Sequence, residues 1–265
     1  MSDPSDSRIS EAALSIYERV RLKTFPVSAT FHSDEAQVPP DSRPSAFMGK
    51  KINLCQAVSL ARFYGMTVGI TRADIMCSPA AVVFGLTDLS DPRRSVTQLW
   101  QEAELSKGSE QAEREAACLS WLEQGEIEAV VLAPARATDV TPHNILLYGN
   151  AHQMALLCAA WSYATGERVG GNFGGKVECA DYLVTPFRSG KPQVVIPGVG
   201  ERIFAGTQDD ELVFAVPAAA LPDLASALAE VGKAIGVGYP LPPYQFFEPS
   251  LPEPHRRLAE EAGII

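Results

Sequence analysis

The segment from 168 to 217 constrains this chain most, because it combines two glycine pairs, a cysteine and two apolar runs. The glycine pairs at 170–171 and 174–175 allow positive φ or a close approach of the backbone to another group. Cys179 follows them at the predicted start of a short helix, where free amides favour an anion or a thiolate. This combination predicts a functional site within the segment.

Apolar runs alternate with helical patterns along the rest of the chain. We therefore expect an α/β (or α+β) fold, a single domain with a mixed sheet flanked by helices. The predicted strands are 27–31, 66–70, 129–133, 144–148, 193–197 and 212–216. Residues 198–200 are predicted to form a turn, and helices over 54–64, 151–165 and 221–236 are predicted to cover the sheet.

The two ends of the chain differ in composition from its middle. Residues 1–10 are polar and acidic, so we expect a disordered N-terminus before a domain over 11–237. Residues 238–265 form a proline-rich C-terminal extension that carries Tyr244, Phe246 and Phe247. These aromatic residues could dock on a second subunit, which would make a homo-oligomer, or fold back on their own core.

The net charge of −10 excludes some classes of partner. Nucleic acid and anionic membrane both require a basic footprint, so neither is expected as a partner. No apolar run is long enough to span a bilayer, and the N-terminus lacks the apolar core of a signal peptide. We therefore expect a cytoplasmic protein whose partner is a small-molecule substrate.

The five cysteines are odd in number and widely spaced, which argues against a disulfide framework. Cys55 lies near the start of a helix that Asn53 can cap, and Cys77 lies just before a helix that Ser78-Pro79 opens. Cys118 and Cys158 occupy amphipathic or apolar helical segments and are expected in the core.

Several motifs together resemble one prokaryotic family, DUF169. They are LCQAVSLAR (54–62), Cys77-Ser-Pro-Ala-Ala, AVVLAPAR, LLYGNAHQM and GKPQVVIPGVGERIFAGTQDDELVFAVP. The resemblance covers residues 15 to 235 and implies a single cytoplasmic α/β domain with cysteines near 55, 77 and 179. The family usually has Gly-Asp-Arg where this chain has Gly200-Glu201-Arg202, a change that keeps the charge and lengthens the acid.

Cys55, Cys77 and Cys179 are candidate metal ligands. Three thiolates can hold a 4Fe-4S iron–sulfur cluster and leave one iron open to substrate. Zinc held by the three cysteines and a water is the alternative, and the thiols could also be buried packing residues or a nucleophile. With metal–sulfur bonds of about 2.3 Å, sulfurs around a cubane are roughly 6–7 Å apart, against about 3.7 Å around one zinc. Glycines expected to border a cluster are Gly171, Gly174 and Gly175.

His152 and Arg202 are the candidate catalytic residues. His152 falls in the first turn of a helix that follows a strand, at the sheet edge where α/β proteins place ligands. Arg202 could grip a carboxylate or phosphate, or form an ion pair with the acids at 209–211. The resulting hypothesis is an iron–sulfur enzyme that acts on a carboxylate- or hydroxyl-bearing substrate in a lyase or hydratase reaction. The other hypothesis is a non-catalytic small-molecule-binding or accessory protein with structural cysteines.

Overall fold

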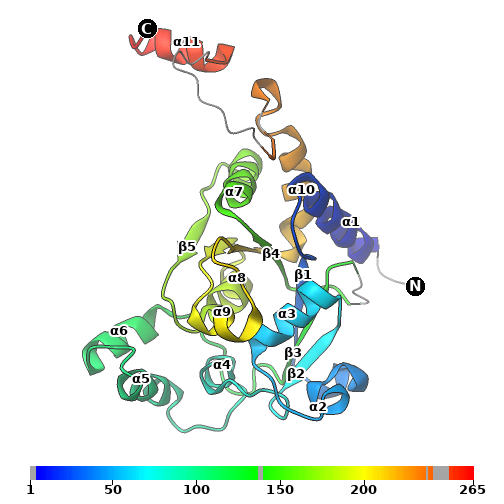
Figure 1. Ribbon diagram of the computed structural model, residues 1–265, viewed down its shortest axis with the longest axis vertical. Helices are drawn as coiled ribbons and strands as arrows, with labels where there is room; N and C mark the ends of the chain where they lie inside the picture. The colour runs from blue at the N-terminus through cyan, green and yellow to red at the C-terminus, as the bar shows by residue number, and fades with distance from the viewer. Residues whose placement is uncertain (1–3, 137–139, 237, 241–250) are drawn as a thin grey trace.

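The computed structural model describes residues 4–136, 140–236, 238–240 and 251–265 (Figure 1). These residues contain a seven-stranded sheet with the strand order β2-β3-β1-β4-β7-β6-β5. Neighbouring strands are antiparallel except β5 and β6, which are parallel. The strands are β1 Val27–His32, β2 Val68–Thr71, β3 Ala129–Pro134, β4 Asn144–Gly149, β5 Gly170–Asn172, β6 Gln193–Val195 and β7 Leu212–Pro217.

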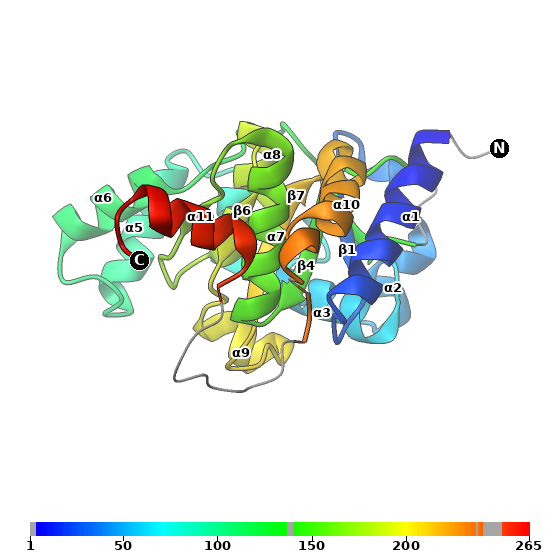
Figure 2. The same cartoon turned by 90° about the horizontal axis from the view of Figure 1, so that it is seen from above.

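Helices cover both faces of the sheet. The helices of the described residues are α1 Pro4–Arg19, α2 Pro44–Phe47, α3 Leu54–Tyr64, α4 Ser78–Val83, α5 Pro92–Glu102, α6 Ser109–Cys118, α7 Ala151–Thr165, α8 Thr185–Ser189, α9 Val199–Ala205, α10 Leu221–Glu230 and α11 Glu253–Glu261. Figure 2 shows α1, α10 and α7 side by side over one face. The opposite face carries α3, α4 and a helical segment in which the π-helical turn Ala180–Val184 leads into α8.

The sheet separates two hydrophobic cores. Successive residues of β4 point to opposite sides, so Ile145 and Leu147 pack with α1, α7 and α10. Leu146 and Tyr148 pack in the other core, with α3, α4 and the π-helical turn. Both cores use the same strands, and the chain therefore forms one α/β domain with a mixed sheet, as predicted.

The six predicted strands are all present, with ends shifted by a few residues. Strand β5 lies in the first glycine pair and was not predicted, because pairing with β6 rather than an apolar pattern defines it. Residues 199–205 form α9, so the turn predicted at 198–200 is wrong beyond Gly198. The side chain of Glu201 accepts a hydrogen bond from the Gly198 amide (3.2 Å), which satisfies a free donor at the helix start.

The chain ends also differ from expectation. Helix α1 begins at Pro4, so residues 4–10 are helical rather than disordered, and Ile9 is buried in the core with α7 and α10. Tyr244, Phe246 and Phe247 lie outside the described residues. No described helix has the length and apolarity needed to cross a membrane.

Candidate functional site

Three separate elements carry the cysteines predicted to act together. Cys55 lies in the first turn of α3, Cys77 is the residue before α4, and Cys179 precedes the π-helical turn. A short parallel bridge between Ile52 and Ile75 brings the starts of α3 and α4 together. In this bridge the Ile52 amide donates to the Asp74 carbonyl (3.0 Å), and the Met76 amide donates to the Ile52 carbonyl (2.8 Å).

The three thiols share one electrostatic neighbourhood. Burial raises the pKa of Cys55 to about 12, and the charges of Glu201 and Cys77 add to the effect. Burial also raises the pKa of Cys179 far above its usual value, with further contributions from Cys77, Glu201, Cys55 and Glu178. Charges act on one another in this way only over short distances. The fold therefore gathers the three cysteines into one region.

The raised pKa values of the cysteines correct the expectation that the helix starts favour thiolates. Backbone amides of Cys55 and Gln56 do lower the pKa of the Cys55 thiol, as a helix start should. Burial is the larger effect, and it also raises the pKa of Cys77. The protein alone thus holds protonated thiols, which are poor nucleophiles. A bound metal would deprotonate them, because coordination supplies the positive charge that the site lacks.

Within the described part of the chain, no three His, Cys, Asp or Glu side chains lie close enough to hold one metal ion. As they stand in the described structure, the three thiols therefore do not form a ready-made metal site.

Two buried glutamates, Glu178 and Glu201, accompany the thiols and were not predicted as site residues. Their exposed fractions are 5% and 3%. Burial raises the pKa of each to about 7, although Arg202 opposes the shift in both. The Tyr182 hydroxyl is near enough to Glu201 to lower its pKa, without completing a hydrogen bond. Such carboxyl groups can exchange a proton near neutral pH.

Several buried polar atoms in this region have no hydrogen-bond partner among the described residues. They are Arg62 Nη1, Glu178 Oε1, the Tyr182 hydroxyl and Glu201 Oε1. Buried polar groups are nearly always paired with protein, water or ligand, because an unpaired one costs free energy. These atoms therefore remain available to pair with water or another polar group.

Backbone geometry around Cys179 is unusual. Val177 has a φ of 56°, a left-handed conformation that is strained for a β-branched residue. The π-helical turn Ala180–Val184 begins just after Cys179. Strained residues and π-helical turns both concentrate at functional sites.

Two of the predicted glycines, Gly171 and Gly175, have clear backbone roles. A β-carbon on Gly171 would come within 2.8 Å of the Val194 carbonyl oxygen, so glycine permits the pairing of β5 with β6. Gly175 has a φ of 74°, and the atom nearest to a β-carbon on Gly174 would belong to Glu115.

His152 and Arg202 line a separate cleft of about 680 Å³, together with Asn150, Asp209, Glu211 and Tyr239. His152 contacts the Tyr239 ring edge-on at 5.2 Å. Arg202 Nη1 donates to the Gln208 carbonyl (2.7 Å) and lies 3.6 Å from Asp209, so the predicted ion pair forms. Consecutive residues of α9 thus place Arg202 at this cleft and Glu201 near the thiols.

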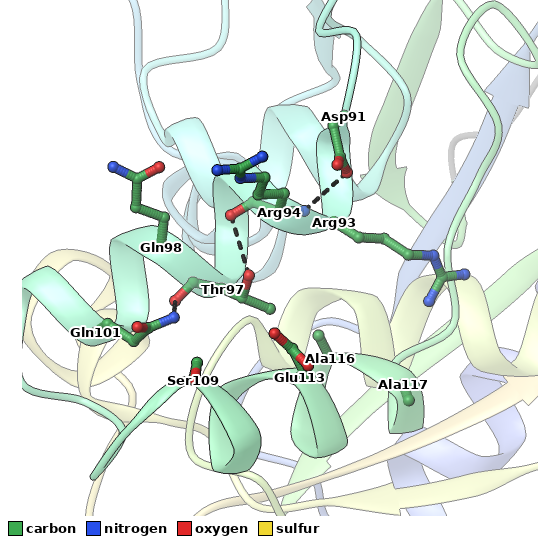
Figure 3. Close-up of a pocket in the computed structure, with 10 residues that line it drawn as sticks. All are labelled: Asp91, Arg93, Arg94, Thr97, Gln98, Gln101, Ser109, Glu113, Ala116 and Ala117. Atoms are coloured by element: carbon green, nitrogen blue, oxygen red, sulfur yellow. Dashed lines mark hydrogen bonds between the residues drawn. The ribbon is translucent and has the colours of Figure 1, made fainter.

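A cleft of about 780 Å³ lies between α5 and α6, in the part of the fold farthest from α10 (Figure 3). Its lining is polar and includes Arg93 and Arg94, and the Asp91 carboxylate accepts a hydrogen bond from the Arg94 amide. No cysteine of the proposed set lines it, so it forms no part of the thiol region.

Cys118 and Cys158 differ from each other. Cys158 packs against the core formed with α7 and α10, as expected. Cys118 is exposed at the end of α6, so its prediction as a core residue is wrong. It falls on the outer side of a helix that buries Ala112 and Ala116 instead.

Comparisons with known proteins agree with the motifs. The profile of the DUF169 family, described as "Uncharacterised ArCR", matches residues 15–227. The "Uncharacterized protein MJ0308" of Methanocaldococcus jannaschii is 26% identical over 175 residues, which cover 66% of this chain and 75% of the relative. No solved structure matches significantly. Because the profile spans most of the domain, the chain belongs to the DUF169 family.

Proposed function

We propose that this protein is an enzyme that binds a 4Fe-4S cluster through Cys55, Cys77 and Cys179. Its substrate is a small molecule with a carboxylate or hydroxyl group, and the reaction is of the lyase or hydratase type. The observation that carries the proposal is the gathering of three thiols from distant parts of the sequence, each close enough to another to raise its pKa.

Three features of the chain support this proposal. The thiols come from rigid helix starts, and backbone amides already favour the charged form at Cys55 and Cys77. Cys55 and Cys77 are half-buried while Cys179 is buried, so the site combines apolar walls with an accessible side. The unpaired polar atoms of Arg62, Tyr182 and Glu201 provide groups for a substrate.

When bound, a cluster with one open iron supplies a Lewis acid that polarises a substrate oxygen. The other functions belong to the chain itself. Glu201, with a pKa of about 7, can accept or return a proton at its carboxylate. Burial of Glu201 and Tyr182 excludes bulk water from that proton.

The second candidate is a non-catalytic small-molecule-binding protein. Cys179 favours it, because this residue packs in the hydrophobic core with Ala180 and Leu183 and is a common type of buried packing residue. In that case the thiols only fill space, and the clefts provide the binding surface.

Anaerobic purification tests the choice. We expect a brown protein with broad sulfur-to-iron absorbance and about four irons and four sulfides per chain, the content of one cubane. Cys55→Ser, Cys77→Ser and Cys179→Ser should each lower the iron content. Cys118→Ser and Cys158→Ser are matched controls that should retain it. A colourless protein that takes up no iron and sulfide on anaerobic reconstitution would refute the cluster.

A further inference from the structure

The cleft of about 680 Å³ lies where the chain leaves the sheet in two opposite directions. Strands β4 and β6 both run antiparallel to β7, so their carboxyl ends point to the same edge of the sheet. From β4 the chain enters α7, which packs beside α10 on one face, whereas from β6 it enters α9, which packs against α3 on the other face. Open α/β sheets place ligands in the crevice that such a divergence creates.

Both walls of this cleft come from residues that follow these two strands. Asn150 and His152 belong to the start of α7. On the other side, Ile196 follows β6 and Arg202 belongs to α9. The Asn150 side chain donates to the Tyr239 hydroxyl (2.9 Å), and the Tyr239 ring meets the His152 ring edge-on. These contacts hold the His152 ring at one wall of the cleft, across from the residues that follow β6.

Arg202 and His152 retain donors for a ligand. Arg202 Nη1 donates to the Gln208 carbonyl (2.7 Å), which orients the guanidinium and leaves Nε and Nη2 without a hydrogen-bond partner among the described residues. The His152 ring also has no hydrogen-bond partner in the described part of the chain. A guanidinium binds a carboxylate through two parallel hydrogen bonds, and an imidazole N–H adds a third. The two side chains therefore suit an anionic oxygen group.

The rest of the lining limits the charge and the shape of the ligand. The carboxylates of Asp209 and Asp210 line the same cleft, and Asp209 lies 3.6 Å from Arg202 Nη1, so a dianion is disfavoured. Ile196 and Leu212 form an apolar part of the lining, and Ile196 is 44% exposed. A hydrocarbon group placed there removes this apolar surface from water. The volume of the cleft lies within the range of small-molecule sites.

We propose that this cleft binds a small monocarboxylate with an apolar body. Arg202 and His152 hold the carboxylate, and the apolar body lies against Ile196 and Leu212. No cysteine is among the described residues that line the cleft. The site therefore requires no bound metal, and the inference goes beyond the function proposed above.

Isothermal titration calorimetry on the iron-free full chain at pH 8 tests the ligand class. The probes are hexanoate and benzoate, their neutral amides hexanamide and benzamide, and the dianions succinate and phosphate. At least one monocarboxylate should bind, tenfold or more tightly than its amide, because the amide forms no charge-assisted hydrogen bond with Arg202. It should also bind more tightly than both dianions. Binding of neither monocarboxylate, or tighter binding of an amide or a dianion, would overturn the proposal.

A matched pair of arginine variants locates the bound probe. Arg202→Lys keeps the charge but loses the planar fork, and should weaken binding about tenfold. Arg94→Lys is the control, because Arg94 lines the separate cleft between α5 and α6 (Figure 3). It should leave binding unchanged. Unchanged binding in Arg202→Lys, or a larger loss in Arg94→Lys, would overturn the proposal.

His152 provides a readout on the unaltered protein. The chain has four histidines, so their ring signals can be followed by NMR, and the signal missing from His152→Gln is that of His152. In the wild type this signal should shift on addition of the monocarboxylate and saturate with the calorimetric affinity. The signal of His143, which packs with Phe31 and Phe187, should stay in place. A His152 signal that does not move at saturation would overturn the proposal.

The outcomes separate this inference from the cluster. A chain that takes up no iron but binds a monocarboxylate through Arg202 would refute the cluster and support the site in the cleft. A chain that takes up iron but binds no monocarboxylate would refute the inference and leave the cluster in place.

Discussion

The carboxylate of Glu178 lies directly against the α-carbon of Gly198, where an added β-carbon would come within 1.9 Å of Oε1. This contact joins the segment that holds Cys179 to the start of α9, which carries Glu201. Glu201 accepts a hydrogen bond from the amide of the same glycine. Gly198 is therefore the point where the two buried acids meet.

Gly198→Ala should destabilise the fold by about 1–3 kcal/mol, because Glu178 must leave a buried position to make room. Gly200→Ala is the matched control, since nothing lies within 4 Å of its added β-carbon and alanine favours a helix. Urea unfolding measures both variants. Equal stability of the two would show that the contact with Glu178 is easily relieved.

Strands at the centre of the sheet were predictable, because burial on both faces produces continuous apolar runs such as that of β3. Strand β5 was not, since it is made of Gly-Gly-Asn and exists only through its pairing with β6. Helix α9 was hidden by Gly198 and Gly200, which suggest a turn when the capping role of Glu201 is unknown.

The candidate site, like the sheet, was only partly predictable from the sequence. Cys55 and Cys77 could be placed at helix starts because caps and proline are local signals. Their convergence depends on the bridge between Ile52 and Ile75, which no local pattern shows. Arg62 lies in an amphipathic helix and has the sequence context of a solvated arginine, and its burial follows only from packing against Tyr148.

Thiol alkylation should rank the cysteines by exposure in the iron-free protein. Iodoacetamide at pH 7.5 should label Cys118 first, because it is exposed. Cys55 should react far more slowly, since burial raises its pKa to about 12 and leaves almost no thiolate. Mass spectrometry after timed quenching gives the rates. Faster labelling of Cys55 than of Cys118 would contradict the buried, protonated site.

Glu201 should make the stability of the iron-free protein fall as the pH rises. Its pKa is raised from 4.5 to about 7, so the native state binds the proton more tightly than the unfolded state. Its contribution is therefore complete below pH 4.5 and is lost as the pH passes 7. Glu201→Gln removes this loss and can still accept the hydrogen bond from Gly198.

Relative to the wild type, Glu201→Gln should gain of the order of 2–3 kcal/mol in unfolding free energy between pH 4.5 and pH 8. Urea unfolding across that range measures the difference. Glu167→Gln is the control, because Glu167 is half exposed in a surface pair with Lys191. Parallel stability curves for the wild type and Glu201→Gln would mean that Glu201 is not buried as a neutral acid.

Lys176 ties the glycine segment to the turn between α5 and α6. Its Nζ donates to the Leu105 carbonyl (2.9 Å) and the Ser106 hydroxyl (3.2 Å), and it forms an ion pair with Glu115. The strained residue Val177 follows at once, so this anchor helps to hold a backbone conformation that the chain would otherwise leave.

Lys176→Met keeps most of the side-chain volume and removes every polar contact of the anchor. We expect a loss of about 1–3 kcal/mol, because the hydrogen bonds involve a charged donor whose side chain is only 13% exposed. Amide exchange should accelerate at residues 170–179, the segment that leads to Cys179, more than in β4 or β7. Lys191→Met, which breaks an exposed ion pair, should change neither stability nor exchange in that segment. If amide exchange in Lys176→Met accelerates no more at residues 170–179 than in β4 or β7, the contacts of Glu178 and the π-helical turn alone fix the position of Cys179.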